Sequence, residues 1–290
     1  MSNNLNVSGY TNENGVPCVR IAELEHFTPS DIFECGQCFR FARLGEERYG
    51  GIARGGYIEA AKEGGEVVIA GSTIEDYYNI WRDYFTIDFD YGKIIKALSA
   101  DPVIGRAISS CPGLRILRQE PFETLISFII SQNNNIPRIK KIVESLCRNF
   151  GEPLDAAGTR FAFPAPEALA SFTIEELAPI RAGFRAKYIL AASRMVADNI
   201  INLGDVYNMS VSEGVKYLCA IPGVGIKVAS CALLFAYGKY DAFPIDVWVR
   251  RILQKYYAGA QPPEERFGEY AGIAGEYLYY YERKISRESV

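Results

Sequence analysis

Lys227 and Asp246 are the two residues of this sequence whose surroundings say most about chemistry. Lys227 comes two residues after the turn Pro222–Gly225. Apolar residues at helical spacing stand on both sides of this turn, so the pattern predicts a tight helical hairpin with Lys227 in the first turn of its second helix. A helix N-terminus favours a neutral amine, the form that a Schiff-base nucleophile needs. A solvated surface lysine is the alternative interpretation.

The same hairpin could bind phosphate. Gly223 and Gly225 have no side chain to keep an anion away from the backbone. The N–H groups at the start of the following helix are unpaired and suited to such an anion. Two helices joined in this way can bind a nucleic-acid backbone without a basic surface, whereas a turn without any ligand is the alternative.

Asp246 lies in FPIDVWVRR, directly before a segment with helical apolar spacing. An aspartate in this position is typically the N-cap of the helix. Its carboxylate could also stabilise the positive charge that develops on a sugar when a glycosidic bond breaks.

A dinucleotide-binding motif is a second interpretation of these residues. Gly223, Gly225 and Ala229 approximate G-x-G-x-x-[GA], and Asp246 follows about twenty residues later. However, Val228 occupies the third position of the motif, and the preceding EGVKYLCA has the spacing of a helix rather than of a strand. A nicotinamide-binding dehydrogenase is therefore disfavoured.

The composition is that of a folded soluble protein. The chain has 290 residues, enough for two domains, of which 49% are apolar and 23% charged. No apolar run is long enough to span a membrane, and the polar N-terminus lacks the pattern of a signal peptide, so we expect a cytoplasmic protein. The net charge of −4 argues against broad electrostatic binding to nucleic acid, but not against a local site built from backbone amides.

The seven cysteines are scattered and odd in number, which indicates reduced thiols. Cys35 and Cys38 form a C-x-x-C pair that could bind zinc or do redox chemistry. No second pair follows, and His26 is the single histidine, so a zinc site is disfavoured.

The order of the elements predicts an α+β fold. Strand-like segments separated by Gly-Gly turns predict an N-terminal antiparallel sheet domain over residues 1–115. From about Tyr77 the spacing becomes helical, and an all-α domain is predicted over residues 116–290. The expected strands are VRIAEL, CFRFARL, RYGGIARG, YIEAAKEG and EVVIAG. Two helices are expected between Pro121 and Gly151, and later ones at 166–171, 174–181, 185–200, 211–220, 226–237, 246–257 and 264–284.

Several motifs together resemble those of one enzyme family. LCAIPGVGIKVAS and FPIDVWVRR resemble the helix–hairpin–helix and Gly/Pro-Asp signature of base-excision DNA glycosylases, and the spacing of Lys227 and Asp246 is similar to that of their catalytic pair. Further matching segments are ECGQCFRF, WRDYFTIDFDY, RQEPFETLISFIISQNNNIPRI, AGFRAKYI and EYAGIA. From about residue 20 to residue 285, the chain resembles the 8-oxoguanine DNA glycosylase/lyase family.

The resemblance implies a monomeric, bifunctional enzyme of base excision repair whose partner is double-stranded DNA. It would flip 8-oxoguanine, preferentially opposite cytosine, out of the duplex. Lys227 would attack C1′, displace the base and form an imine, and β-elimination would cut the strand on the 3′ side while Asp246 supports the reaction. We expect no cofactor, iron–sulfur cluster or catalytic metal, but a monovalent cation at the carbonyls of Cys219, Ile221 and Val224.

The resemblance also assigns lesion recognition. The carbonyl of Gly36 would accept a hydrogen bond from N7 of 8-oxoguanine, which carries a hydrogen that guanine lacks. A strand bulge is the alternative use of this glycine. Cys231 and Tyr279 would sandwich the flipped base, with tyrosine where many relatives have phenylalanine. Gly275 replaces a glutamine that reads the Watson–Crick edge, so we expect looser reading there by backbone, water or Glu276.

Other family positions concern the orphan base and the DNA backbone. Asn133, Arg138 and Arg185 would contact the orphan cytosine, and the alternative is that the two arginines neutralise phosphates. The remaining positions are the aromatic wedge Phe184, the hairpin glycines Gly223 and Gly225, and Trp248, which stands where some relatives have a phosphate-contacting histidine.

Two related branches are disfavoured by single features. Endonuclease III-like and adenine glycosylases usually carry four cysteines for an iron–sulfur cluster after the catalytic aspartate, but no cysteine follows Cys231 here. Alkylation-repair glycosylases lack the lysine that this chain has at position 227. A related glycosylase for other damaged bases stays open as the alternative.

Overall fold

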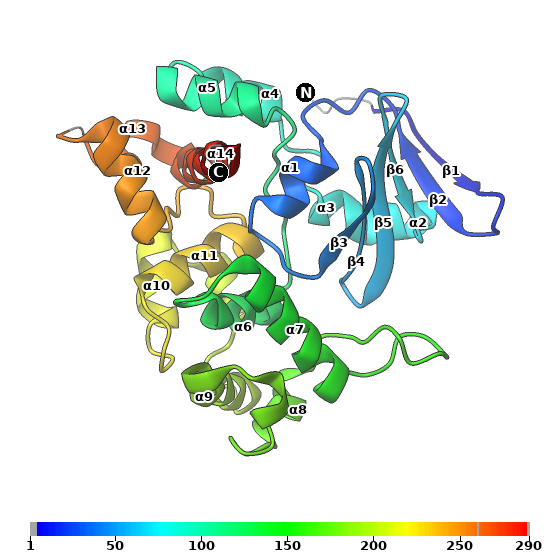
Figure 1. The fold of residues 1–290 in the computed structure, drawn as a ribbon, viewed down its shortest axis with the longest axis vertical. Helices are drawn as coiled ribbons and strands as arrows, with labels where there is room; N and C mark the ends of the chain where they lie inside the picture. Colours follow the sequence, from blue (N-terminus) through cyan, green and yellow to red (C-terminus); the bar gives the residue numbers. More distant parts are fainter. Residues whose placement is uncertain (1–4, 260, 289–290) are drawn as a thin grey trace. The chain divides into compact units, whose positions relative to one another are not determined.

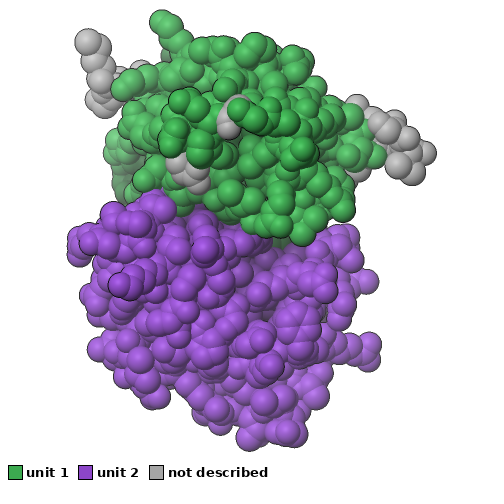
Figure 2. Space-filling view, turned by 90° about the vertical axis from the view of Figure 1, so that its left-hand side faces the viewer, with its two compact units in different colours: residues 1–51, 57–118, 240–290 green, residues 52–56, 119–239 purple. Residues whose placement is uncertain are grey.

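The computed structural model describes residues 5–259 and 261–288 (Figure 1). Residues 1–4 of the polar N-terminus, residue 260 and residues 289–290 lie outside the described part. Two compact units are formed (Figure 2): unit 1 is residues 1–51, 57–118 and 240–290, and unit 2 is residues 52–56 and 119–239. The predicted division at residue 115 follows the order of the chain, whereas residues 240–290 cluster with the N-terminal region.

Six antiparallel strands form one sheet in the order β1-β2-β6-β5-β4-β3, which confirms the predicted N-terminal sheet. Val19, Ile69 and Ala60 oppose one another on neighbouring strands and are 0% exposed, so this face of the sheet belongs to the core. The strands, drawn in blue and cyan in Figure 1, are β1 (Val7–Thr11), β2 (Pro17–Ile21), β3 (Phe41–Gly45), β4 (Arg48–Ala53), β5 (Gly56–Glu63) and β6 (Glu66–Ala70).

Two features of the sheet differ from the sequence pattern. Strand β1 is not predicted, because its residues VSGYT are mostly exposed and show no alternation between apolar and polar residues. The predicted strand CFRFARL begins only at Phe41, so Cys38 lies in the loop that precedes it. Phe41 stacks on Phe33 of the preceding helix with ring centroids 4.1 Å apart, and this contact holds the loop's two ends against the core.

The helices of unit 1 come from two parts of the chain, one before residue 118 and one after residue 240. The predicted single helix over residues 264–284 is wrong, because Gly268 has a φ of +54° that an α-helix cannot continue through. The elements are α1 (Pro29–Glu34), α2 (Ile74–Asp76), the π-helix η1 (Tyr77–Trp81), α3 (Arg82–Tyr84), α4 (Tyr91–Leu98), α5 (Pro102–Ser110), α12 (Val247–Tyr257), α13 (Pro263–Phe267), the 3₁₀ turn η5 (Gly268–Tyr270) and α14 (Ala271–Glu288).

Unit 2 is built around helix α11, which is buried along most of its length. Its residues from Val228 to Tyr237 are all buried, and Phe235 stacks on Phe128 of helix α6 with ring centroids 5.3 Å apart. The elements are α6 (Pro121–Ser131), α7 (Ile136–Phe150), α8 (Pro166–Ala170), η2 (Ala178–Ile180), η3 (Gly183–Arg185), α9 (Ala186–Ala197), η4 (Asp205–Asn208), α10 (Val211–Leu218) and α11 (Ile226–Tyr237).

The predicted helices of unit 2 are confirmed with one exception. The segment 174–181 forms only the 3₁₀ turn η2. Pro179 lies inside this segment, and a proline there removes the N–H that a longer helix would use.

Two properties of the described chain bear on the sequence predictions. Over residues 5–259 and 261–288, no helix is both long and apolar enough to cross a membrane. Over the same residues, no three or more His, Cys, Asp or Glu side chains gather so that they could hold a metal ion. All seven cysteines are reduced thiols, including Cys35 and Cys38.

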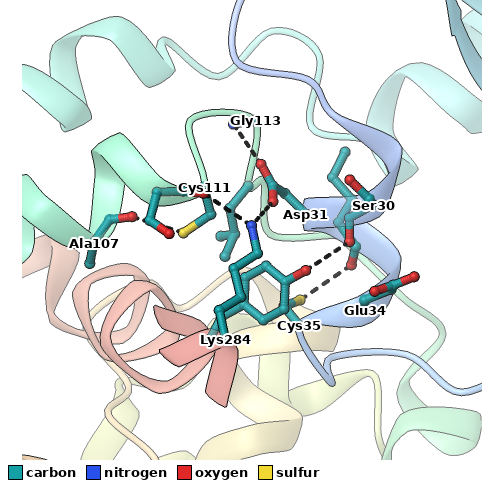
Figure 3. Close-up of polar contacts among 12 residues, drawn as sticks. Ser30, Asp31, Glu34, Cys35, Ala107, Cys111, Gly113 and Lys284 are labelled. Atoms are coloured by element: carbon teal, nitrogen blue, oxygen red, sulfur yellow. Dashed lines mark hydrogen bonds and ion pairs between the residues drawn. The ribbon is translucent and has the colours of Figure 1, made fainter. Parts of the chain in front are cut away.

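An ion pair with a buried carboxylate fastens helix α14 to helix α1 (Figure 3). The ammonium of Lys284 donates to Asp31 Oδ1 at 2.8 Å and to the Ser110 carbonyl at 3.0 Å, and the Gly113 N–H donates to Asp31 Oδ2 at 3.2 Å. The Asp31 side chain is only 4% exposed. Burial raises the pKa of Asp31, and the Lys284 ammonium partly offsets this effect. The charged form of Asp31 is therefore stabilised in this buried place by the Lys284 ammonium.

We expect Lys284→Met to destabilise the fold by roughly 3 kcal/mol, because it leaves the Asp31 carboxylate buried without its cation. Below the ordinary aspartate pKa, the carboxyl is protonated in both folded and unfolded chains, so the loss should be small. It should grow as the pH rises above the raised folded-state pKa of Asp31, and be complete only above the still higher pKa that this carboxyl has without the Lys284 ammonium. Urea denaturation of both chains across this pH range measures the difference.

Two variants control for the loss of a lysine as such. Asp31→Asn in the Lys284→Met background should recover stability at neutral pH, because a neutral amide needs no cation. Arg148→Met removes an exposed pair with Glu144 and should change stability by less than about 0.5 kcal/mol. A loss from Lys284→Met that is equal at every pH would show that only the packing of its stem matters.

Candidate active site

The predicted hairpin exists, and its turn has a defined geometry. The Val224 N–H donates to the Ile221 carbonyl at 3.0 Å, and Gly223 has a φ of +82°. Pro222 at the second position and glycine at the third are the residues that a type II turn requires. The sharp break between helices α10 and α11 is therefore a built turn, with Gly225 as the N-cap of α11.

The two glycines of the turn are used differently. A Cβ at Gly223 would lie 2.2 Å from the Tyr188 ring, so glycine is required there by packing as well as by φ. A Cβ at Gly225 would meet no atom within 4 Å, and the φ of Gly225 is −96°. The fold itself therefore gives no reason for glycine at 225, and the backbone N–H groups beyond it stay open to a ligand.

Lys227 lies in the first turn of α11, as predicted. Its ammonium donates to Ser131 Oγ at 3.3 Å and lies 5.0 Å from the centroid of the Phe128 ring. Both partners belong to the end of helix α6, so a neighbouring helix fixes the amine rather than solvent. Cys231 follows one helical turn after Lys227 and is buried. A solvated surface lysine is thus not what the structure shows.

The loop after α6 is tied to the hairpin and to Arg185. Gln132 Nε2 donates to the Gly223 carbonyl at 3.0 Å. Arg185 is 3% exposed and donates to the carbonyls of Gln132, Asn133 and Ala182, with four hydrogen bonds in total. A guanidinium has five N–H groups, so most of this donor set is used within unit 2.

Unlike the buried Arg185, the other residues predicted to lie near the orphan base are exposed. Asn133 and Arg138 are exposed, and the Phe184 ring is 52% exposed with the Arg185 guanidinium 4.4 Å from its centroid. Burial first, and the Arg138 charge second, lower the pKa of Arg185, so the two arginines lie close together. Asn133 and Arg138 can meet a ligand as they stand, whereas Arg185 holds the loop that presents them.

In unit 1, Asp246 is the N-cap of α12, as predicted. Its Oδ1 accepts a hydrogen bond from the Val249 N–H at 2.8 Å. Trp248, in the first turn of the same helix, is 43% exposed, and Val247 is 60% exposed. Large apolar side chains at an exposed helix start suit contact with a partner surface. Lys227 belongs to unit 2 and Asp246 to unit 1, and their pairing stays a prediction.

Gly36 lies in the loop between α1 and β3, not in a strand bulge. Its φ of +106° is suited only to glycine. The next residue, Gln37, is 1% exposed; its side-chain amide donates to the carbonyls of Ile32 and Arg115 and accepts from the Leu117 N–H. The backbone that follows Gly36 is therefore fixed by a buried network.

Tyr279 and Gly275 lie on consecutive turns of α14. The Tyr279 ring packs against Phe243, Val249 and Ala271, and burial raises the pKa of Tyr279 to about 12. A Cβ at Gly275 would lie 2.8 Å from the Phe243 ring, so this ring occupies the space that a side chain would need. Glu276 is 8% exposed, and burial together with the Glu276 carboxylate raises the pKa of the Cys35 thiol.

Comparison with known proteins agrees with these features. Residues 19–125 match the family model of the 8-oxoguanine DNA glycosylase N-terminal domain, and residues 126–271 match that of HhH-GPD superfamily base excision DNA repair proteins. An 8-oxoguanine glycosylase/lyase of Clostridium acetobutylicum, solved with double-stranded DNA containing cytosine opposite 8-oxoG, is 36% identical with a TM-score of 0.91 and covers 97% of this chain and 98% of its own.

The chain belongs to the 8-oxoguanine DNA glycosylase family.

Further relatives of this glycosylase agree. MBOgg1, solved in complex with a low affinity DNA ligand, is 40% identical with a TM-score of 0.91, over 97% of this chain and 99% of its own. The N-glycosylase/DNA lyase OGG1 of Arabidopsis thaliana is 29% identical over 279 residues, which are 85% of this chain and 75% of that protein. The chain is thus an enzyme, a DNA N-glycosylase and DNA lyase.

The dehydrogenase alternative is wrong, because helix α10 precedes the glycines where that motif needs a strand.

Four residues of the glycosylase that matter for these sites were missed by the sequence analysis. Gln132 and Tyr188 support the turn, Phe243 fills the space at Gly275, and Arg283 contacts the residue before Gly36. Gln132 lies in the motif SQNNNIPRI, which indicated that this segment matters but not that Gln132 contacts Gly223. Tyr188 and Phe243 also lie in quoted motifs, AGFRAKYI and FPIDVWVRR, but they and Arg283 act through contacts between distant segments, which a single sequence does not reveal.

The turn glycines should respond differently to alanine. Gly223→Ala should destabilise the glycosylase by roughly 2 kcal/mol or more, because the new methyl group meets the Tyr188 ring in a conformation with positive φ. Gly225→Ala should leave stability within about 0.5 kcal/mol, because the space is open and the φ is ordinary. Thermal and urea denaturation measure both. A large loss in Gly225→Ala would mean that the turn, and not a ligand, needs this glycine.

Proposed function

We propose that this enzyme excises 8-oxoguanine, preferentially opposite cytosine, from duplex DNA through a Schiff base on Lys227 and then cleaves the strand by β-elimination. The observation that carries the proposal is the fixed amine of Lys227 at the start of α11, directly after the open backbone of Gly225. The relatives' names and the DNA in the Clostridium acetobutylicum structure support the choice of substrate.

The chemistry needs only a nucleophilic amine and a flipped nucleotide. The Lys227 nitrogen attacks C1′, the C1′–N9 bond breaks, and the base leaves with the bonding electrons and takes up a proton. Opening of the sugar ring gives the imine, a C1′=N double bond that makes the C2′ proton acidic. Loss of that proton expels the 3′ phosphate and cuts the strand. The imine is the electron sink, so we propose that no cofactor, iron–sulfur cluster or catalytic metal takes part.

Asp246 supports the first step electrostatically. One of its oxygens caps helix α12 through the Val249 N–H, so the carboxylate is held at a fixed place on the helix. A fixed negative charge stabilises the positive charge that develops on the sugar while the C1′–N9 bond breaks. The monovalent cation expected at Cys219, Ile221 and Val224 stays a prediction, as do the monomeric state and the cytoplasmic location.

The lesion is recognised through its N7 hydrogen. The Gly36 carbonyl accepts a hydrogen bond from 8-oxoguanine and repels the N7 lone pair of guanine, while Cys231 and Tyr279 stack on the two faces of the base. Packing of Phe243 on Gly275 supports the expectation that the Watson–Crick edge is read less tightly. A glycosylase for a wider set of guanine-derived lesions is therefore the second candidate function.

Borohydride trapping tests the nucleophile. The wild-type enzyme should form a covalent product with a duplex that contains 8-oxoguanine opposite cytosine, because borohydride reduces the imine to a stable amine. Lys227→Gln should abolish both trapping and strand cleavage, since an amide nitrogen does not attack C1′. Gel electrophoresis of the trapped product measures the outcome.

Lys216→Gln is the matched control, because Lys216 is an exposed lysine on the other helix of the hairpin. It should trap like wild type. Undiminished trapping by Lys227→Gln would assign the nucleophile to another amine, and a wild type that never traps would remove the Schiff base from the proposal.

The orphan base is read by Arg138 and Asn133. Cytosine offers acceptors at O2 and N3 to an arginine and an amino group to the asparagine carbonyl, whereas adenine presents its amino group to the arginine. Arg138 is exposed on the first turn of α7, where the Asn135 side chain caps the helix through the Arg138 N–H at 3.0 Å. Arg185 contributes by holding the carbonyls of Gln132 and Asn133, and its direct contact with cytosine stays a prediction.

We expect wild type to cleave fastest opposite cytosine, and Arg138→Ala to narrow the preference over adenine. Loss of such a contact costs about 1–3 kcal/mol, and the cost should fall mainly on the cytosine duplex. Single-turnover rates opposite each of the four bases measure it. Lys141→Ala, another exposed cation on α7, should weaken all four duplexes alike. A uniform loss in Arg138→Ala would show that Arg138 contacts phosphate instead.

A further inference from the structure

Arg283 of α14 contacts both elements that the proposed function assigns to the lesion in unit 1. Its Nη1 donates to the Cys35 carbonyl at 3.2 Å and to the Glu34 carbonyl at 3.5 Å. Its guanidinium carbon also lies 5.4 Å from the centroid of the Tyr279 ring. Cys35 directly precedes Gly36, and Tyr279 lies one helical turn before Arg283. One side chain therefore joins the backbone beside Gly36 to the stacking ring.

The Gly36 backbone needs such support, because its φ of +106° belongs to a region that glycine enters at little cost but also leaves easily. On its C-terminal side, the buried Gln37 amide fixes the chain to the carbonyls of Ile32 and Arg115. On its N-terminal side, the peptide that joins Cys35 to Gly36 is held by the hydrogen bond from Arg283.

We propose that Arg283 is a positioning residue for lesion recognition, which sets the direction of the Gly36 carbonyl relative to the plane of the Tyr279 ring. The inference rests on the proposed function, since it takes Gly36 and Tyr279 as the groups that meet 8-oxoguanine. The discriminating hydrogen bond is directional, so a rotated peptide would lose it without any loss of fold.

Arginine suits this role better than lysine. Its guanidinium is planar, so it can lie over an aromatic ring while its edge donates to carbonyls. A lysine ammonium keeps a donor for the Cys35 carbonyl but has no plane to set against Tyr279. Arg283→Lys is therefore expected to rescue part of the function that Arg283→Met loses.

A variant of the neighbouring Lys284 can distinguish a positioning role of Arg283 from general anchoring of α14. Figure 3 shows it directed to Asp31, and its hydrogen bonds go to Asp31 and the Ser110 carbonyl, whereas those of Arg283 go to the Glu34 and Cys35 carbonyls. A variant of Lys284 loosens the attachment of α14 as a whole, whereas a variant of Arg283 acts on Gly36 and Tyr279.

The experiment compares two substrates in the same duplex, 8-oxoguanine and a preformed abasic site opposite cytosine. Arg283→Met should slow single-turnover release of 8-oxoguanine roughly tenfold, the effect of losing a charge-assisted hydrogen bond, while abasic cleavage stays within about twofold. Arg283→Lys should fall between Arg283→Met and wild type on 8-oxoguanine. Lys284→Met should lower the midpoint of urea denaturation yet leave the ratio of the two rates unchanged.

Equal losses of Arg283→Met on the two substrates would overturn the inference, because an abasic site has no base for Gly36 to read. If Lys284→Met also slowed 8-oxoguanine release but not abasic cleavage, the inference would be overturned as well, because general anchoring of α14 would then explain the effect. A wild-type enzyme that cleaves abasic DNA but releases no 8-oxoguanine would instead overturn the proposed function, and this inference with it.

Discussion

Hydrogen bonds of residues 131–133, at the end of α6 and in the loop that follows it, connect Lys227, the hairpin turn and Arg185 in unit 2. Ser131 accepts from the Lys227 ammonium, and the Gln132 side chain donates to the Gly223 carbonyl in the hairpin turn. The Gln132 and Asn133 carbonyls in turn accept from the buried Arg185. Lys227, the hairpin turn and Asn133 are thus connected through one short segment. Movement of this segment would disturb the proposed nucleophile and the proposed orphan-base contact together.

The arrangement explains how an acidic chain can bind a polyanion. The net charge of −4 gives no broad attraction to DNA, so affinity must come from a few places. The N-terminus of α11 behind Gly225 offers main-chain N–H groups with no Cβ in the way, and the first turn of α7 offers Arg138. Binding of this kind would depend on geometry more than on total charge, and the Tyr188 ring and the Gln132 hydrogen bond fix that geometry at Gly223.

The sequence was sufficient for most of the elements and for the residues whose role is local. Lys227 in a first helical turn and Asp246 as an N-cap follow from spacing and residue type alone, because turns and caps are decided within a few residues. The break at Gly268 was missed, since the apolar spacing continues through it and only the φ of this glycine reveals the end of a helix. The burial of Arg185 was also missed, because its acceptors lie about fifty residues away in the chain.

The pair Gly275 and Phe243 shows why a residue-by-residue comparison with relatives does not predict the packing around one position. Taken alone, glycine in place of a glutamine suggests an empty space beside the lesion. The structure shows that a Cβ at Gly275 would meet the Phe243 ring at 2.8 Å, and this ring is 6% exposed in a cluster with Val249 and Ala271. A glutamine at position 275 would therefore require a smaller residue at position 243. Under the proposed function, recognition of the base would then rest on the backbone of Gly36 and the ring of Tyr279, the two groups that Arg283 joins.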